Sequence, residues 1–281
     1  MQDKLIRLRA ILSEMGSVAV AYSGGTDSAF ILAVARDALG DRALALTADS
    51  PSVPRAELEA ARAVAAGLGV EHVVLPTAEL DDPAYRANTP DRCYFCKSNY
   101  LDELLAYALA HGYPCLVDGA NADDLGDYRP GQNAARERGV RSPLQEVGLT
   151  KAEIRTLARA RGLPNWDKPA AACLASRIPY GTPVTAEALA QIEAAEESLH
   201  RLGFRQVRVR HHGTVARLEV EPGELARAVE LREEIVAALR EVGFTYVTLD
   251  LAGFRSGSMN LTLIPKQTAD TCTHLRCAGA V

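Results

Sequence analysis

Two cysteines lie three residues apart in the segment DRCYFCK, residues 91–97, in front of a stretch with helical periodicity. A pair with this spacing serves as half of a zinc site, as a redox dithiol, as an anchor for an iron–sulfur cluster, or as two buried thiols. Six cysteines in 281 residues do not make a disulfide scaffold. The other residues of the sequence therefore have to decide between these chemistries.

A third cysteine, Cys173, lies in the segment KPAAACLASRIPYGTP, residues 168–183. A cysteine among alanines is most often a small buried apolar side chain. A reactive or metal-binding sulfur is the alternative, because Arg177 and Lys168 are near enough to stabilise a thiolate. A zinc site would need a fourth ligand. None of the remaining candidates has ligand-like spacing to the pair: Cys115, Cys272, Cys277 and the histidines.

The segment AYSGGTDSA, residues 21–29, forms a polar turn between an expected strand and an expected helix. Its two glycines let backbone N–H groups converge, and the helix N-terminus adds a positive dipole, so the turn is suited to bind an anion. The Walker pattern and its lysine are missing, which favours cleavage of ATP between the α- and β-phosphates. We expect these residues to contact the nucleotide: Ser23, Gly24, Gly25, Thr26, Asp27 and Ser28.

Two further segments follow strands at the carboxyl edge of the expected sheet, where open α/β folds bind nucleotides. Ala48, at the end of the second strand, is expected to contact adenine or ribose. The segment DGANADDLGDYRPG, residues 118–131, is dense in carboxylates, which either lie on the surface or face Mg²⁺, a cationic substrate or Arg129. Its position favours a site, with Gly119 at the nucleotide and Asp124 and Arg129 at the substrate.

Arg208 and Arg210 share one face of an expected strand, because strand side chains alternate, and Val207 and Val209 are expected to face the core. Paired arginines suit bidentate binding of a phosphate. A solvated basic face balanced by Glu219 and Glu221 fits the same pattern. Arg255, in the segment FRSGSMN, is a further candidate for substrate binding.

The elements that would position these residues alternate in type over the first part of the chain. The periodicity predicts strands at 17–22, 42–50, 71–77 and 114–121, and helices at 28–39, 55–69, 97–112 and 150–162. This alternation predicts an α/β fold with a parallel sheet and right-handed crossovers.

The pattern changes at about residue 186. A helix at 186–202, a hairpin over 205–220, a helix at 222–242 and a strand at 245–251 predict a smaller α+β domain. We therefore predict two domains, at 1–185 and 186–281.

The composition is that of an ordinary soluble globular protein, with 48% apolar and 24% charged residues. The formal charge of −5 argues against a nucleic-acid partner. The start of the chain is predicted to be an amphipathic helix rather than a signal peptide, and no apolar run reaches the ~20 residues that span a bilayer. These features predict a cytoplasmic protein with reduced cysteines and no membrane partner.

The segment SGGTDS closely resembles the signature of the PP-loop (adenine nucleotide alpha hydrolase-like) ATP pyrophosphatases. Over residues 20–260 the chain also resembles the LarE family of that superfamily, with these segments in matching order: DRCYFCK, DGANADDLGDYRPG, RSPLQEVGLTKAEIR, DKPAAACLASRIPYGTPVT and FRSGSMN. LarE proteins are ATP-dependent sulfur transferases of nickel-pincer nucleotide synthesis, whose product serves the cofactor of lactate racemase and related enzymes.

The resemblance implies a reaction in two steps. ATP with Mg²⁺ adenylates a carboxylate of pyridinium-3,5-biscarboxylic acid mononucleotide and releases pyrophosphate, and a thiocarboxylate then replaces the adenylate. The resemblance favours phosphate binding by Arg208 and Arg210, with Arg177 and Arg255 as further candidates. It also implies a sulfide or sulfur donor as a partner and a homo-oligomer.

The family uses two variants of the sulfur step. In one, a cysteine matching Cys173 gives up its own sulfur and ends as dehydroalanine after one turnover. In the other, three cysteines hold a [4Fe–4S] cluster whose open iron carries an extra sulfide, and this sulfide attacks the adenylate. Because the chain has Cys93, Cys96 and Cys173, we expect the cluster-dependent variant. Three thiolates would leave one iron open for a small ligand.

Two rival functions fit part of this pattern. A tRNA thiolase of the same superfamily also pairs a PP-loop with three cluster cysteines, but the acidity of the chain and the lack of an evident RNA-binding module argue against it. A non-catalytic ATP-binding or cluster-binding module would bind ATP without forming AMP and pyrophosphate.

Overall fold

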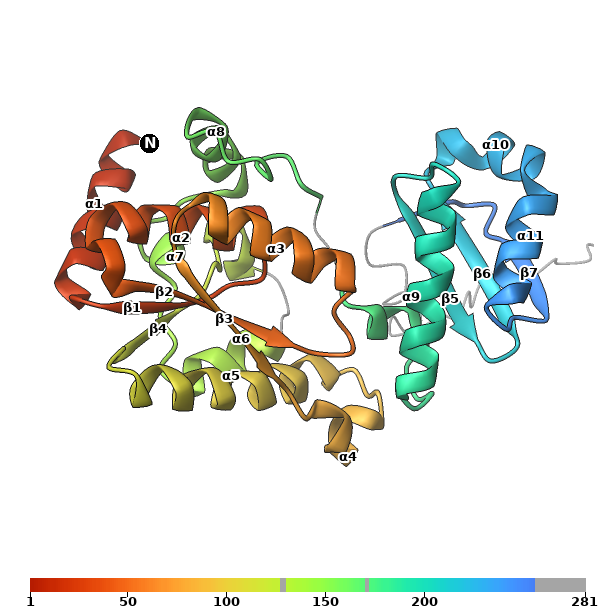
Figure 1. The fold of residues 1–281 in the computed structure, drawn as a ribbon, viewed down its shortest axis with the longest axis horizontal. Coiled ribbons are helices and arrows are strands. Elements are labelled where there is room, and N and C mark those ends of the chain that lie inside the picture. Colours follow the sequence, from red (N-terminus) through yellow and green to blue (C-terminus); the bar gives the residue numbers. More distant parts are fainter. Residues whose placement is uncertain (127–129, 170–171, 256–281) are drawn as a thin grey trace, which may run out of the picture.

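A computed structural model describes residues 1–126, 130–169 and 172–255 and contains two β-sheets (Figure 1). The first sheet is parallel, with four strands in the order β3-β2-β1-β4. Its strands are β1 (Val18–Ala21), β2 (Ala43–Asp49), β3 (Glu71–Pro76) and β4 (Cys115–Val117). The second sheet is smaller and mixed. The predicted α/β class, with a parallel sheet and a smaller α+β part, is confirmed.

Helices cover both faces of the parallel sheet (Figure 1). Side chains alternate along β1, so Val18 and Val20 pack into one buried cluster while Ala19 packs into the other. The first cluster includes residues of α1 (Gln2–Met15), α2 (Thr26–Leu39), α3 (Arg55–Gly67), α7 (Pro143–Glu146) and α8 (Lys151–Ala160). The second includes residues of α5 (Arg92–Ala110) and α6 (Pro130–Glu137). Burial on both faces explains why these strands are almost continuously apolar.

The helix that carries the cysteine pair begins earlier than predicted. The periodicity placed its start at residue 97, but α5 starts at Arg92, so both cysteines lie in its first turns. Pro90 precedes this start, and the side chain of Arg92 is buried and hydrogen-bonded, which fixes the turn. Because residues at i and i+3 share one face of a helix, Cys93 and Cys96 point to the same side.

Short elements connect the main ones. Three of them border the site described below: η2 (Glu79–Asp81), α4 (Pro83–Arg86) and η4 (Leu174–Arg177). The others are η1 (Gly40–Arg42), η3 (Ala122–Gly126) and η5 (Pro222–Glu224). The sequence had predicted an irregular stretch for 163–185, and η4 is the only helical element within its described residues.

The second sheet has the order β5-β6-β7, and α9 and α11 pack on it. Its elements are α9 (Ala186–Arg201), β5 (Val207–His212), β6 (Val215–Val220), α10 (Leu225–Glu230), α11 (Arg232–Glu241) and β7 (Tyr246–Leu249). The predicted hairpin is present, turning at Gly213 with a φ of 64°. The single helix predicted at 222–242 is wrong. Leu231 adopts a ψ of 21° and packs against the core, which divides the helix in two.

A buried cluster joins the two parts of the molecule. It contains Tyr85 from α4, residues of η4 and the first turns of α9, and Cys96 and Cys173 pack against its edge. The exact domain boundary at 185 stays a prediction. None of the described helices combines the length and apolarity needed to cross a membrane.

Candidate active site

The nucleotide loop joins β1 to α2 at the carboxyl edge of the parallel sheet. Gly24 has a φ of 71°, and a Cβ at this position would lie 2.6 Å from Cβ of Ala61 on α3, so only glycine fits. The hydroxyls of Ser23 and Ser28 lie 3.1 Å apart and close the turn. The first N–H groups of α2 have no partner within the helix, so the loop has the features of a phosphate site.

Asn165 forms hydrogen bonds with two residues of the nucleotide loop. Its Nδ2 donates to the carbonyl of Gly24 at 2.9 Å, and its own carbonyl accepts from the hydroxyl of Thr26 at 2.8 Å. Asn165 lies in the irregular segment after α8, where the sequence gives no periodic signal for its contacts. It is a structural partner of the nucleotide loop that the sequence analysis missed.

A lysine also lies beside the nucleotide loop. Nζ of Lys151 is 2.7 Å from Oδ2 of Asp27, and Nδ2 of Asn121 donates to the same oxygen at 3.3 Å. The other oxygen, Oδ1, is buried and has no hydrogen-bond partner among the described residues. Lys151 reaches this place because it is the first residue of α8, and α8 packs on α2. The sequence reveals the capping box of Thr150 and Glu153 that starts α8, but not the packing that brings Lys151 to the loop.

The segment after β4 closes against the nucleotide loop. A Cβ on Gly119 would lie 2.8 Å from the backbone nitrogen of Ser28, so the two segments are in direct contact. Asp118 is buried, and its two oxygens contact Nζ of Lys97 at 3.1 Å and the hydroxyl of Ser142 at 2.7 Å. Lys97 follows Cys96 on α5. The pair of Lys97 and Asp118 therefore connects the cysteine helix to the nucleotide edge.

The other carboxylates of this segment are also engaged by protein groups. Asp124 is buried and accepts the N–H of Asn121 at 2.9 Å, and Asp123 accepts the N–H of Lys151 at 2.8 Å. The expected substrate role of Asp124 stays a prediction. Arg129 lies outside the described residues, as does Asp127.

The three predicted cysteines come together from two distant segments. Cys93 is exposed on α5, and Cys96 and Cys173 are half-buried at the edge of one cluster, all three as free thiols. Burial raises the pKa of the Cys96 thiol, and the nearby acidic groups of Cys173, Glu79 and Cys93 raise it further. The N–H of Leu174 donates to the carbonyl of Ser52 at 2.8 Å, which ties the Cys173 segment to the loop after β2.

The donor set of this site consists of thiols on two separate segments. In the described part of the chain, no three His, Cys, Asp or Glu side chains are close enough together to coordinate a single metal ion. An iron–sulfur cluster binds each thiolate to a different iron and so needs them further apart than one ion does. Three convergent free thiols beside an apolar wall fit such a cluster better than a closed zinc site.

Two of the predicted arginines are bound to buried carboxylates. Arg177 contacts Glu196 through Nε at 2.9 Å and Nη2 at 2.8 Å, and its Nη1 donates to the carbonyl of Cys173 at 3.0 Å. Arg210 contacts Glu219 through Nε at 2.9 Å and Nη2 at 2.8 Å, and its Nη1 donates to the carbonyl of Ser176 at 2.9 Å. Arg177 therefore ties the cysteine segment to α9, and Arg210 ties it to the second sheet.

Arg208 differs from these two. It is half-buried over the ring of Phe254, and no carboxylate of the described residues lies within ion-pair distance of it. Burial, together with the positive charge of Arg177, lowers the pKa of Arg208 to about 10. An anion bound at this place would relieve that cost. Arg255 is exposed at the end of the described residues.

Comparison with known proteins decides the family. A family model described as asparagine synthase, of the PP-loop superfamily, matches residues 9–232. A pyridinium-3,5-bisthiocarboxylic acid mononucleotide synthase of Lactiplantibacillus plantarum is 40% identical over 267 residues, covering 95% of this chain and 97% of that protein. This chain belongs to the LarE family. An uncharacterized protein of Synechocystis is 47% identical over 265 residues, covering 94% and 99%, and one of Methanocaldococcus jannaschii is 28% identical over 256 residues, covering 90% and 98%.

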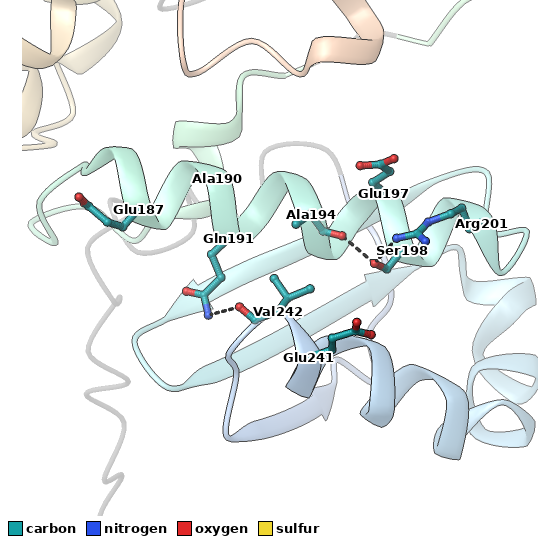
Figure 2. A pocket seen from close by; sticks show the side chains of 9 residues that line it. All are labelled: Glu187, Ala190, Gln191, Ala194, Glu197, Ser198, Arg201, Glu241 and Val242. Atoms are coloured by element: carbon teal, nitrogen blue, oxygen red, sulfur yellow. Dashed lines mark hydrogen bonds between the residues drawn. The ribbon is translucent and has the colours of Figure 1, made fainter.

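Membership of the LarE family makes this chain an ATP-dependent enzyme of the PP-loop type. A groove of about 440 Å³ borders Gly24 of the nucleotide loop, between α3 and the segment that holds Asn165 and Lys168. A larger groove, of about 650 Å³, lies between α9 and α11 (Figure 2). No predicted site residue lines the larger groove.

Proposed function

We propose that this LarE protein uses ATP to adenylate a carboxylate of pyridinium-3,5-biscarboxylic acid mononucleotide and converts it to a thiocarboxylate. The proposal is supported by the name of the relative that is 40% identical over nearly the whole chain. It is also supported by the contacts of the segment 172–178, which is hydrogen-bonded to the loop after β2 through Leu174 and to Arg210 of the second sheet, and whose Cys173 packs against the same cluster as Cys96.

In the first step the substrate carboxylate attacks the α-phosphorus, and the bond from that phosphorus to the bridging oxygen breaks to release pyrophosphate. The backbone of Ser23–Ser28 would hold the phosphates, and Ala48 and Gly119 would border the nucleoside. Lys151 would place a positive charge near the departing pyrophosphate, since it lies beside Asp27. Oδ1 of Asp27, which has no hydrogen-bond partner among the described residues, would suit a Mg²⁺ ion, because Mg²⁺ prefers oxygen ligands.

The substrate has one phosphate, which needs a cationic partner. Arg208 is the best candidate, because it is half-buried and no carboxylate of the described residues pairs with it. Arg177 and Arg210 would hold the Cys173 segment beside that phosphate through their carbonyl contacts. This arrangement would bring the adenylated carboxylate to the sulfur site.

In the second step a sulfur nucleophile attacks the carbonyl carbon of the adenylate, and the bond to AMP breaks. The residues fit a [4Fe–4S] cluster: Cys93, Cys96 and Cys173 would hold it, and it would supply sulfide at its open iron. The apolar wall of Tyr85 and Leu174 would keep water from the adenylate, whose hydrolysis competes with sulfur transfer.

One observation carries the proposal. The segment that bears Cys173 is hydrogen-bonded to the loop after β2 through Leu174 and to the second sheet through Arg210. Since nucleotides bind at the carboxyl edge of such sheets, the sulfur lies between the expected adenylate and the expected phosphate site. A module that only binds ATP has no need of a thiol at that position.

The test is anaerobic purification with analysis of iron and sulfide, followed by turnover with ATP, sulfide and the dicarboxylate mononucleotide. We expect AMP, pyrophosphate and thiocarboxylate in equal amounts, formed only when the mononucleotide is present. ATP binding without AMP formation would instead indicate the non-catalytic module. AMP formation that depends on unmodified tRNA would indicate the thiolase.

A further inference from the structure

A buried asparagine and a buried arginine join the cysteine helix to the Cys173 segment. Asn88 is fully buried and has a φ of 52°, which makes it the only residue other than glycine with positive φ in the part of the chain that the structure describes. Its Nδ2 donates to the carbonyls of Pro179 and Thr182, each at 2.8 Å, and its own carbonyl accepts the N–H of Gly181 at 3.0 Å. A left-handed conformation in a buried asparagine persists only where surrounding contacts enforce it.

Arg92 extends this connection to the sulfurs. Nη1 of Arg92 donates to Oδ1 of Asn88 at 2.6 Å and to the carbonyl of Ala175 at 2.8 Å. Arg92 directly precedes Cys93 on α5, and Ala175 lies two residues after Cys173. The arginine is thus the first residue of the cysteine helix and donates to the backbone of the segment that carries Cys173.

The charge of Arg92 is buried without a carboxylate partner among the described residues. Only 4% of the residue is exposed, and no carboxylate within the described ranges lies at ion-pair distance from it. Arg177 and Arg210 are equally buried, yet each has a bidentate glutamate. A buried cation without an anion is costly, so an anion is expected nearby when the site is complete.

The acidic groups that would interact with Arg92 when ionised are the thiols of Cys173 and Cys93, followed by the phenols of Tyr85 and Tyr180. A cysteine that binds iron does so as a negatively charged thiolate, whatever the pKa of the free thiol. A cluster held by three thiolates would therefore supply the missing anion, and it would do so directly beside the guanidinium.

We propose that Arg92 is the positioning cation of the cysteine site, which fixes the Cys173 segment over α5 and balances the negative charge of the thiolates once iron is bound. The inference deepens the proposed function and rests on its three-cysteine cluster. It assigns to Asn88 the task of orienting the guanidinium, since the same amide group also fixes the chain after η4.

The charge is tested with Arg92→Gln, Arg92→Lys and Arg86→Gln in the anaerobically reconstituted protein. Arg86 is an exposed arginine at the end of α4, so its substitution removes the same charge six residues away. We expect Arg92→Gln to lower iron per chain several-fold and to make the reduction potential of the remaining cluster more negative, because a nearby cation favours the more reduced state. Arg92→Lys should restore the potential, and Arg86→Gln should match the unsubstituted protein.

Unchanged iron content and potential in Arg92→Gln would overturn the proposal. Equal losses in Arg92→Gln and Arg92→Lys would overturn it as well, because the charge would then play no part. If Arg92→Gln does not fold, Arg92→Lys is the deciding variant. We then expect its cluster to keep the reduction potential of the unsubstituted protein, and a shifted reduction potential would overturn the proposal.

A separate measurement distinguishes this proposal from the cluster itself. If the unsubstituted protein takes up no iron, the cluster assignment fails, and hydrogen exchange of the metal-free chain then decides the role of Arg92. Loss of a charged hydrogen bond to Ala175 should raise amide exchange over residues 174–184 by about tenfold in Arg92→Gln relative to Arg86→Gln. Equal exchange in the two variants would overturn the positioning role.

Discussion

Nζ of Lys151 lies 2.7 Å from Oδ2 of Asp27, which ties the first residue of α8 to the nucleotide loop. In Walker loops a lysine within the loop contacts the terminal phosphates, and the loop of this chain has none. Lys151 brings a cation to the same neighbourhood from a helix more than a hundred residues away. Its position beside Asp27 suits an interaction with the departing pyrophosphate.

Replacement of Lys151 by methionine should therefore lower the rate of pyrophosphate formation by about 10²-fold, since charge that develops on the leaving group would lose its partner. Pyrophosphate release with saturating ATP is the measurement. Lys4→Met is the matched control, because Lys4 also binds a carboxylate in the first turn of α8, Glu153, at 2.7 Å. Equal rates in the two variants would remove Lys151 from the reaction.

Gly119→Ala should weaken ATP binding. The new Cβ would lie 2.8 Å from the backbone nitrogen of Ser28 and 3.1 Å from its Cα, and neither atom can move without shifting the nucleotide loop. Overpacking of this kind costs about 1–3 kcal/mol in stability, and the Kd for ATP should rise with it. Gly67→Ala is the control, since a Cβ there meets nothing within 4 Å. An unchanged Kd for ATP in Gly119→Ala would show that the loop tolerates the displacement.

Arg208 and Arg210 should respond differently to the same substitution. Arg208→Gln should raise the KM for the mononucleotide at least about tenfold with little change in Tm, because a charged hydrogen bond to phosphate is lost. Arg210→Gln should lower the free energy of unfolding by about 3 kcal/mol, because it breaks the buried pair with Glu219. Steady-state kinetics and urea unfolding separate the two effects. Similar KM and stability changes in both variants would contradict the assignment.

The link between α1 and α8 should make stability depend on acid pH. The hydrogen bond from Lys4, followed by that from the backbone of Thr150, lowers the pKa of Glu153 to about 2. A folded-state pKa below the unfolded value of about 4.3 gives stability that is fully present above pH 4.3 and lost as the pH falls towards 2. The effect should stay below about 1 kcal/mol, since the pair is partly exposed.

Urea unfolding at pH 6 and pH 3 measures this dependence. The unsubstituted protein should lose more stability between the two values than Glu153→Gln, which cannot titrate. Parallel losses in both proteins would place the acid sensitivity elsewhere.

The parts of the site that the sequence could predict are those carried by local patterns. The loop at Ser23–Ser28 needs only a strand, two glycines and a helix start, which are neighbours in the chain. The family resemblance added Cys173 to Cys93 and Cys96, and in the structure Cys96 and Cys173 pack against one cluster, with Cys93 one turn before Cys96 on α5. The parallel sheet followed in the same way from alternating periodicity.

What the sequence could not predict depends on partners that are distant in the chain. Lys151 reaches Asp27 only because α8 packs on α2. Arg210 looked equivalent to Arg208 on the strand, but Glu219 on the next strand binds Arg210 and leaves Arg208 without a carboxylate among the described residues. Arg92 lies within DRCYFCK, but that segment does not predict the burial of its arginine, and Asn88 carries no motif. The burial of both depends on the Cys173 segment, which folds over α5.

The central claim is that Cys93 and Cys96 let the enzyme keep Cys173. The most direct measurement counts thiocarboxylate formed per chain, with sulfide supplied anaerobically, in the unsubstituted protein, in Cys93→Ala and in the control Cys115→Ala, whose thiol lies on β4. We predict several products per chain and an intact Cys173 in the first and third, and at most one product in Cys93→Ala. A single product per unsubstituted chain with Cys173 converted to dehydroalanine, or full multiple turnover in Cys93→Ala, would contradict the account.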